Sequence, residues 1–213
     1  MKFSILTPSF NQARFLERHI QSVLNQGVEG TQHIIYDGGS TDETPAILQR
    51  YSDRLFFWAS ENDRGQGDAL NKALAKASNE IIGWLNTDEF YEPHVFEIVR
   101  DIFERDPKVM VVYGNHRQYT PAEELIRTSR TWRFDYEICR MQTPIMVSAA
   151  TFLRRDRLLE VGGFDPRWQC IMDWDVFIRY MKDNQKWVRL RRVLANATMH
   201  PLSKTARLPE VFL

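Results

Sequence analysis

Residues 81–93 read Ile81-Ile82-Gly83-Trp84-Leu85-Asn86-Thr87-Asp88-Glu89-Phe90-Tyr91-Glu92-Pro93. The apolar run at 81–85 predicts a buried strand, and it ends abruptly at an amide followed by carboxylates. In open α/β sheets the carboxyl ends of strands border the crevice in which ligands bind. Neighbouring carboxylates repel unless a cation or hydrogen bonds stabilise them, and oxygen ligands suit Mg²⁺ or Mn²⁺. The segment therefore predicts a site for a metal and a phosphate, although an acidic helix start before Pro93 explains these residues equally well.

The first half of the chain alternates predicted strands with predicted helices. Apolar residues recur at helical spacing between the strands, and Ser40 with Glu43 fits a capping box at the start of one helix. Strands separated by helices imply right-handed crossovers and a largely parallel sheet, so the expected fold is a Rossmann-like α/β domain. The predicted strands are 2–7, 33–36, 55–59, 81–85 and 109–113.

The second half is less regular. Residues 117–133 predict a hairpin or a loop, and residues 147–153 predict a strand. A short helix at 156–161 and a longer one at 173–181 follow. At this length one domain over residues 1–213 is expected, with the second half capping the sheet.

Composition excludes several classes of protein. Basic and acidic residues number 28 each, so no global field attracts nucleic acid, and no nucleic-acid partner is expected. No apolar run approaches the ~18 residues of a transmembrane helix, and the start of the chain, broken by Pro8, is unlike a signal peptide. Cys139 and Cys170 lack metal-site spacing and are expected to be thiols in a reducing cytoplasm, while a disulfide between them stays open.

Polar clusters follow the predicted strands of the first half. One such cluster is ordinary turn composition, but several along one sheet edge predict a nucleotide site. Asp37 suits hydrogen bonds from a base or ribose, or a helix cap, and Arg64 suits a phosphate or a surface ion pair. The chain has neither a G-x-G-x-x-G after a strand nor a G-x-x-x-x-G-K-[ST], which disfavours a dinucleotide dehydrogenase and a P-loop kinase. The clusters are Thr7-Pro8-Ser9-Phe10-Asn11, Asp37-Gly38-Gly39-Ser40-Thr41-Asp42, Glu61-Asn62-Asp63-Arg64-Gly65-Gln66-Gly67-Asp68 and Asn86-Thr87-Asp88-Glu89.

Taken in order, these clusters resemble family 2 glycosyltransferases of the GT-A fold. The likeness covers nearly the whole chain and implies a mostly parallel central sheet flanked by helices. It also implies a nucleotide-sugar-binding half at 1–115 and a smaller acceptor-binding half at 116–213. Three later motifs continue it, namely Gly162-Gly163-Phe164-Asp165, Met172-Asp173-Trp174-Asp175 and His200-Pro201-Leu202-Ser203-Lys204-Thr205.

The resemblance implies an inverting transfer of a sugar from a nucleotide diphosphate sugar, usually of the uridine or thymidine type. The implied acceptor is a hydroxyl of a saccharide or lipid-linked saccharide in glycan or polysaccharide biosynthesis. Asp88 and His200 are the implied ligands of Mn²⁺ or Mg²⁺, and Asp173 is the implied general base. The candidate residues for binding the nucleotide sugar are Thr7, Pro8, Ser9, Asn11, Asp37, Arg64, Asp68, Asn86 and Thr87.

The chain departs from the family pattern at two positions. Asn86 stands where an aspartate is common, which removes a charge and weakens the case for metal binding, although an amide oxygen can still ligate or contact ribose. Glu89 also replaces an aspartate, and its longer side chain changes where the carboxylate lies. A lone histidine such as His200 is otherwise a packing residue. Asp175 is expected to pair with Arg179 four residues on.

Two rival functions follow from these departures. A sugar-phosphate nucleotidyltransferase needs a glycine-rich, basic loop after its first strand, where this chain has residues 8–11. A catalytically inactive nucleotide-sugar-binding or assembly protein is compatible with Asn86, but the retention of Asp88, Asp173 and His200 together argues against it. The arginines at 127, 130 and 133 are either solvated surface or contacts to an anionic lipid-linked acceptor. The expected location is the cytoplasm, at or near the inner face of the membrane through peripheral contact.

Overall fold

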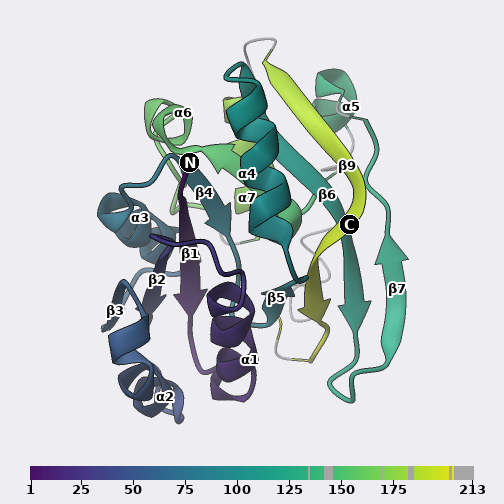
Figure 1. Cartoon of the computed structure of the whole chain (residues 1–213). Coiled ribbons are helices and arrows are strands. Elements are labelled where there is room, and N and C mark those ends of the chain that lie inside the picture. The colour runs from purple at the N-terminus through teal and green to yellow at the C-terminus, as the bar shows by residue number, and fades with distance from the viewer. Residues whose placement is uncertain (134, 142–145, 169, 182–184, 202, 204–213) are drawn as a thin grey trace.

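The computed structural model describes residues 1–133, 135–141, 146–168, 170–181, 185–201 and 203. Residues 202, 204 and 205 of the last predicted motif therefore lie outside the described part. In chain order the elements are β1 (Phe3–Ser9), α1 (Ala13–Leu24), β2 (Gln32–Asp37), α2 (Thr44–Arg50), a 3₁₀ turn (Ser52–Arg54), β3 (Phe57–Ser60), α3 (Gln66–Lys76), β4 (Ile81–Trp84), β5 (Glu89–Tyr91), α4 (Val95–Arg105), β6 (Val109–Tyr119), β7 (Leu125–Ser129), α5 (Tyr136–Met141), a second 3₁₀ turn (Ser148–Ala150), β8 (Thr151–Arg154), α6 (Arg155–Glu160), α7 (Met172–Tyr180) and β9 (Lys186–Thr198) (Figure 1).

The strands found in the described residues form one 9-stranded sheet in the order β3-β2-β1-β4-β8-β6-β9-β5, with β7 paired to β6 outside that path. Neighbours β1, β2, β3 and β4 are parallel, as are β6 and β9. Strands β8, β5 and β7 run antiparallel to their partners. The prediction of an α/β fold with a mostly parallel sheet is confirmed.

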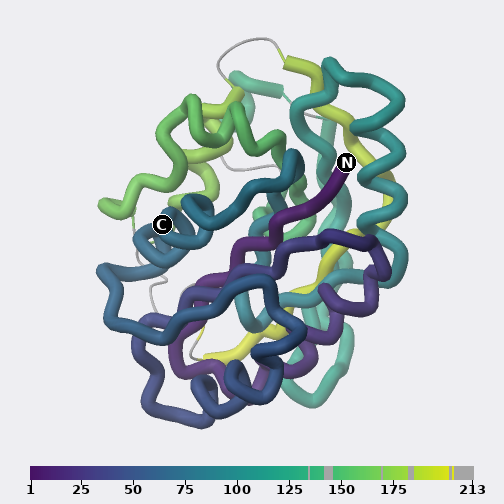
Figure 2. Tube along the Cα trace, turned by 60° about the vertical axis from the view of Figure 1, so that its left-hand side comes forward, coloured from purple at the N-terminus to yellow at the C-terminus, as the bar shows by residue number. Residues whose placement is uncertain are grey.

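Helices cover both faces of this sheet because successive strand residues point to opposite sides. Ile5 packs with α4, whereas its neighbour Leu6 packs with α3 and α7. In Figure 1 α4 lies in front of the sheet, and the turned view of Figure 2 shows α6 and α7 on the other side. The two faces hold separate buried clusters, so the sheet is enclosed and only its edges and strand ends are open to ligands.

The predicted irregular segment at 117–133 is a hairpin between β6 and β7. Three elements were not predicted, namely the helix α5, the short β5 and the long β9, which pairs with both β5 and β6. The sequence hides β9 because Arg189, Arg191 and Arg192 interrupt its apolar pattern. The predicted boundary at residues 115 and 116 falls inside β6.

The predicted capping box is wrong. Helix α2 begins at Thr44, after the N-cap Glu43, and Pro45 stands in its first turn. Ser40 instead turns back to Asp37, donating from its hydroxyl to the Asp37 carboxylate. The Ser40 oxygen, which an N-cap would offer to a helix amide, accepts instead from the backbone amide of Asn11 at 2.7 Å.

Asn71 of α3 joins the first half of the chain to the second. Its Nδ2 donates to the Phe164 carbonyl at 2.6 Å, and its Oδ1 accepts from the Phe164 amide at 2.9 Å. The adjacent Gly163 has φ +65°, a left-handed conformation that favours glycine. This two-way bond fixes the chain that leads to α7.

We expect Asn71→Ala to lower the free energy of unfolding by about 1–3 kcal/mol, because it leaves the buried backbone groups of Phe164 without partners. A thermal unfolding curve measures the effect, and Asn25→Ala, at an exposed position after α1, is the control. An unchanged melting temperature for Asn71→Ala contradicts this role.

Two expectations from composition can be compared with the structure. Cys139 and Cys170 are both thiols, so they are not joined in a disulfide. Within the described ranges, no helix has the length and apolar character needed to cross a bilayer.

Candidate active site

The loops that follow β1, β2 and β4 begin at the same edge of the sheet. Parallel pairing places Ser9 beside Asp37 at the ends of β1 and β2. The Thr87 hydroxyl donates to the Pro8 carbonyl at 3.1 Å, which ties the loop after β4 to the end of β1. The Asn11 amide donates to the Ser40 hydroxyl at 2.7 Å, which ties the loops after β1 and β2. The predicted convergence of these loops is therefore present.

Asp37 is buried at the end of β2. Its carboxylate accepts from the Ser40 amide at 2.8 Å, from the Ser60 hydroxyl at 2.6 Å and from the Ser40 hydroxyl. An ionised carboxylate offers about four lone-pair positions, so one remains for a ligand. Asp37 thus organises the loop around it and keeps the capacity for one further hydrogen bond.

The predicted site residues at the end of β1 and just after it differ in whether a polar side-chain atom remains for a ligand. The Thr7 hydroxyl is fully buried and contacts two histidines, so its side chain is not available to a ligand. The Ser9 hydroxyl is buried and has no hydrogen-bond partner among the described residues. Asn11 accepts from the Thr41 amide at 2.9 Å and is exposed. Ser9 is therefore the residue of this loop that offers an unused polar atom.

The loop before α3 carries an ion pair. Arg64 donates to Asp68 at 2.8 Å, and the Arg64 side chain is 79% exposed. This hydrogen bond is the main cause that lowers the pKa of Asp68. In this structure Arg64 forms the surface ion pair that the sequence left open, and a contact to phosphate stays a prediction.

Asn86 uses its amide oxygen inside the protein. Its Oδ1 accepts from the Trp84 ring nitrogen at 3.0 Å and from the Gln66 amide at 2.6 Å. An indole nitrogen only donates, which fixes the orientation of the Asn86 amide, and both lone pairs of its oxygen are occupied. The Asn86 oxygen is thus not placed to ligate a metal, and the amide nitrogen is the group left for a ligand.

Asp88 lies beside His200, as the metal prediction requires. The His200 Nε2 is 3.2 Å from the Asp88 Oδ2, and the Phe15 ring packs against the imidazole with centroids 4.7 Å apart. The Thr198 amide donates to the Asp88 carbonyl at 2.9 Å, so the end of β9 brings the two side chains together. In the part of the chain that the structure describes, no group of three or more acidic, His or Cys residues is arranged to hold a metal alone.

Asp173 lies in the first turn of α7. A Cβ at Gly67 would lie 3.0 Å from Pro166 and 3.1 Å from the Met172 sulfur, so α3 and the start of α7 are in close contact. The Asp173 Oδ1 accepts from the Trp174 amide at 2.9 Å. Burial raises the pKa of the Asp173 carboxyl above its usual 3.8. Asp175 pairs with Arg179 at 2.6 Å, as predicted, and serves the structure of the helix.

The pKa of the Glu89 carboxyl responds to the charges of both Asp88 and Asp173. Burial, the charge of Asp88 and the charge of Asp173 all raise the pKa of the Glu89 carboxyl well above its usual value. The Glu89 carboxylate also accepts a hydrogen bond from the backbone amide of Asn86 at 2.7 Å, which closes the turn around Asp88. Asp88 and Asp173 are therefore both near enough to Glu89 for their charges to act on it, although 84 positions separate Glu89 from Asp173 in sequence.

Several residues of this site were not predicted. Gln66 and Ser60 act through contacts between loops, which no local sequence pattern reveals. His19 did carry a signal, because it occupies a buried position between Leu16 and Ile20 on the apolar face of α1. A histidine among core positions needs a polar partner.

A family model described as Glycosyl transferase family 2 matches residues 4–163. The chain is 33% identical over 200 residues to a chondroitin synthase from Escherichia coli, which covers 92% of this chain and 29% of that protein. It is 27% identical over 204 residues to a hyaluronan synthase from Pasteurella multocida, which covers 92% of this chain and 20% of that protein. The chain thus spans less than a third of the length of these relatives.

Two solved structures share the fold. S. aureus TarS 1-349 in complex with UDP-GlcNAc superposes with a TM-score of 0.78 at 18% identity, over 100% of this chain and 63% of that one. The mannosyltransferase PcManGT from Pyrobaculum calidifontis, in complex with GDP-Man and Mn²⁺, gives 0.73 at 20% identity, over 96% and 59%. At these identities the likeness shows the GT-A fold. Together with the match of the family model over residues 4–163, it shows that the chain belongs to glycosyl transferase family 2.

Proposed function

We propose that this chain is an inverting glycosyltransferase that moves a sugar from a nucleotide diphosphate sugar to a hydroxyl acceptor. The observation that carries the proposal is the pairing of Asp88 with His200 at 3.2 Å, with Asp173 near enough that the charges of Asp88 and Asp173 both raise the pKa of Glu89. Direct displacement needs a group that neutralises the leaving diphosphate and a base for the attacking hydroxyl within reach of one sugar.

The donor is held by the loops after β1, β2 and β4. The unused Ser9 hydroxyl and the remaining acceptor position of Asp37 supply hydrogen bonds to the nucleoside. A uridine or thymidine diphosphate sugar is the proposed donor, and the complex of TarS with UDP-GlcNAc supports the first of these. The names of the chondroitin and hyaluronan synthases support a saccharide acceptor in polysaccharide biosynthesis.

Asp88 and His200 fit a divalent cation that is shared with the diphosphate. Mg²⁺ and Mn²⁺ sites of this kind use few protein ligands and complete their coordination with phosphate oxygens and water. The pair at 3.2 Å matches that need, and the Mn²⁺ complex of PcManGT supports it. The bound cation would neutralise the charge that develops on the leaving diphosphate.

Asp173 is the proposed general base. It takes the proton from the acceptor hydroxyl as that oxygen bonds to the anomeric carbon and the nucleoside diphosphate leaves from the opposite face. A base works best when its pKa approaches the working pH, and burial moves the Asp173 pKa in that direction.

One observation favours a second candidate, a nucleotide-sugar-binding protein without turnover. Both lone pairs of the Asn86 oxygen are taken by Trp84 and Gln66, so the position that is acidic in many relatives adds no ligand here. Such a protein keeps the donor site and lacks transfer.

A thermal-shift screen with UDP, dTDP and GDP sugars, each with and without Mn²⁺, tests the proposal. A ligand at 100 times its Kd raises the stability by about 2.7 kcal/mol. We expect at least one donor to raise the melting temperature more in the presence of Mn²⁺, and release of free nucleoside diphosphate when that donor meets saccharide acceptors. Stabilisation without release on any acceptor favours the inactive protein, and no stabilisation by any donor contradicts both.

A further inference from the structure

Three buried side chains form a continuous set of contacts that the proposed chemistry does not use. The Thr7 Oγ1 lies 2.9 Å from the His19 Nε2 and 3.2 Å from the His33 Nε2. The other ring nitrogen of His19, Nδ1, lies 2.9 Å from the backbone carbonyl of Glu89. The set therefore links the interior of the sheet to the turn that carries Asp88.

The partners determine where each hydrogen lies. A carbonyl only accepts, so the His19 Nδ1 carries the hydrogen and donates to Glu89. Burial lowers the pKa of His19 to about 4, so the ring is neutral at neutral pH and carries one hydrogen, on Nδ1. Its Nε2 therefore has no hydrogen and accepts from the Thr7 hydroxyl. The His33 Nε2 lies 3.2 Å from both the Thr7 oxygen and the unprotonated His19 Nε2, so it carries a hydrogen and donates toward these two atoms. All the donors point the same way, from His33 to the Glu89 carbonyl.

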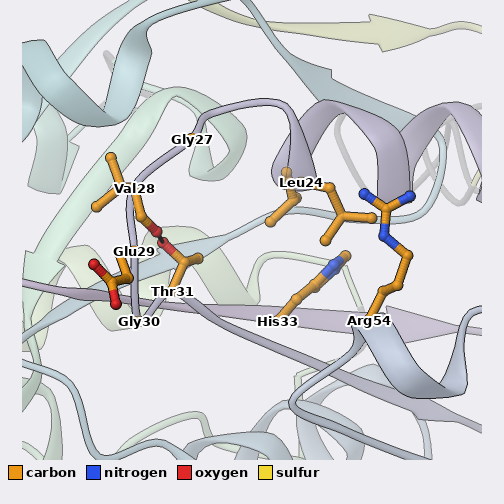
Figure 3. Close-up of a pocket in the computed structure, with 9 residues that line it drawn as sticks. Leu24, Gly27, Val28, Glu29, Gly30, Thr31, His33 and Arg54 are labelled. Carbon is orange, nitrogen blue, oxygen red and sulfur yellow. Dashed lines mark hydrogen bonds between the residues drawn. The ribbon is translucent and has the colours of Figure 1, made fainter.

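The other end of this set of hydrogen bonds, at His33, lies away from the candidate active site. His33 stands near the start of β2 and lines a pocket of about 220 Å³ between β2 and the end of α1 (Figure 3). The His33 Nδ1 is buried and has no partner among the described side chains. With the hydrogen of the neutral His33 ring on its Nε2, this Nδ1 is an acceptor that no described side chain satisfies.

Helix α1 contacts the turn that carries Asp88, residues 86–89, through the Glu89 carbonyl. The turn is also tied by the Glu89 amide, which donates to the Asn86 carbonyl at 3.0 Å, and by Thr198, which holds the Asp88 carbonyl from β9. Only His19 among these partners comes from α1, and α1 also contributes Phe15 against His200. Helix α1 thus contacts His200 directly and reaches Asp88 through the carbonyl of the next residue, Glu89.

We infer that His19 is a positioning residue, which donates from its Nδ1 to the Glu89 carbonyl and so holds Asp88 at the distance from His200 that a divalent cation shared with a diphosphate needs. Thr7 and His33 fix the tautomer that makes this donation. The inference rests on the proposed function, because it gives His19 a role in the same site.

A matched pair of substitutions tests this inference. In His19→Asn the side-chain nitrogen lies near the place of the imidazole Nδ1 and keeps the bond to Glu89. In His19→Gln the amide reaches the place of the Nε2 and keeps only the contact to Thr7. Asn is one methylene smaller than Gln, so a general loss of packing would affect His19→Asn at least as strongly as His19→Gln.

The measurements are hydrogen exchange of the peptides that cover residues 86–91 and calorimetric binding of UDP with and without Mn²⁺. For His19→Gln we expect faster exchange in that segment and a Kd for UDP in Mn²⁺ that rises about 10-fold or more, as for other residues that orient metal ligands. We expect UDP binding without metal to stay unchanged, and His19→Asn to stay close to wild type in both measurements.

The outcomes separate the two proposals. Equal behaviour of His19→Gln and wild type, or equal losses in both variants, overturns the positioning role. A wild type whose binding of UDP does not depend on Mn²⁺ overturns the proposed metal site instead, while the exchange of residues 86–91 still reports whether His19 anchors the turn.

Discussion

Asp173→Asn is expected to lower the turnover number of sugar transfer by about 10²–10⁴-fold, the usual contribution of a positioned base. The fold should survive, because an asparagine oxygen still accepts from the Trp174 amide. Burial raises the pKa of Asp173, so the ionised form is disfavoured in the folded protein above pH 3.8, and the neutral amide should keep or raise the melting temperature. Donor affinity, measured by calorimetry, should be nearly unchanged.

Asp175→Asn is the matched control two positions away on the same helix. It removes the negative charge from the pair with Arg179 and should lower stability while the turnover number of the folded enzyme changes little. In wild type the rate should fall with decreasing pH as Asp173 takes up a proton, at a pH above the usual 3.8 of an aspartate. Near-normal turnover of Asp173→Asn would show that another group is the base.

Removal of the metal is expected to have an effect of similar size. Excess chelator should abolish transfer by wild type, and added Mn²⁺ should restore it. Asp88→Asn should lower transfer by about 10²-fold or more, because a charge that stabilises the leaving diphosphate is no longer held in place. The dependence of UDP binding on Mn²⁺, followed by calorimetry, should disappear in the same variant.

Asp101→Asn makes the same change of charge on the surface of α4, at a side chain that is 53% exposed beside Arg105. We expect no change in transfer or in metal dependence from this control. Full activity of wild type in excess chelator would exclude the metal role of Asp88 and His200.

Apart from the short β5, the order of strands and helices in the first half was predictable because apolar periodicity is a local property. The same is true of the Asp175–Arg179 pair, which needs only helical spacing. The long strand β9 was not predictable, since its exposed arginines mask the alternation and its partners β5 and β6 lie far away in sequence. Sequence thus located the first half of the sheet more securely than the second.

The composition of the site was predictable in outline, but the state of each group was not. The pairing of Asp88 with His200 was expected from the resemblance, and the structure brings them to 3.2 Å. That the Asn86 oxygen is already satisfied depends on Trp84 and Gln66, and only the folded arrangement shows it. The bond from His19 to the Glu89 carbonyl is likewise a contact between a helix and a turn 70 residues apart.

The most direct test of the account is a crystal structure of the chain with UDP and Mn²⁺, in which anomalous scattering locates the metal. The account predicts manganese bound by Asp88 and His200 together with the diphosphate, with the Asp173 carboxylate facing the space where the sugar would lie. A nucleotide bound at another part of the protein, or an Asp173 side chain turned away from the diphosphate, would contradict it.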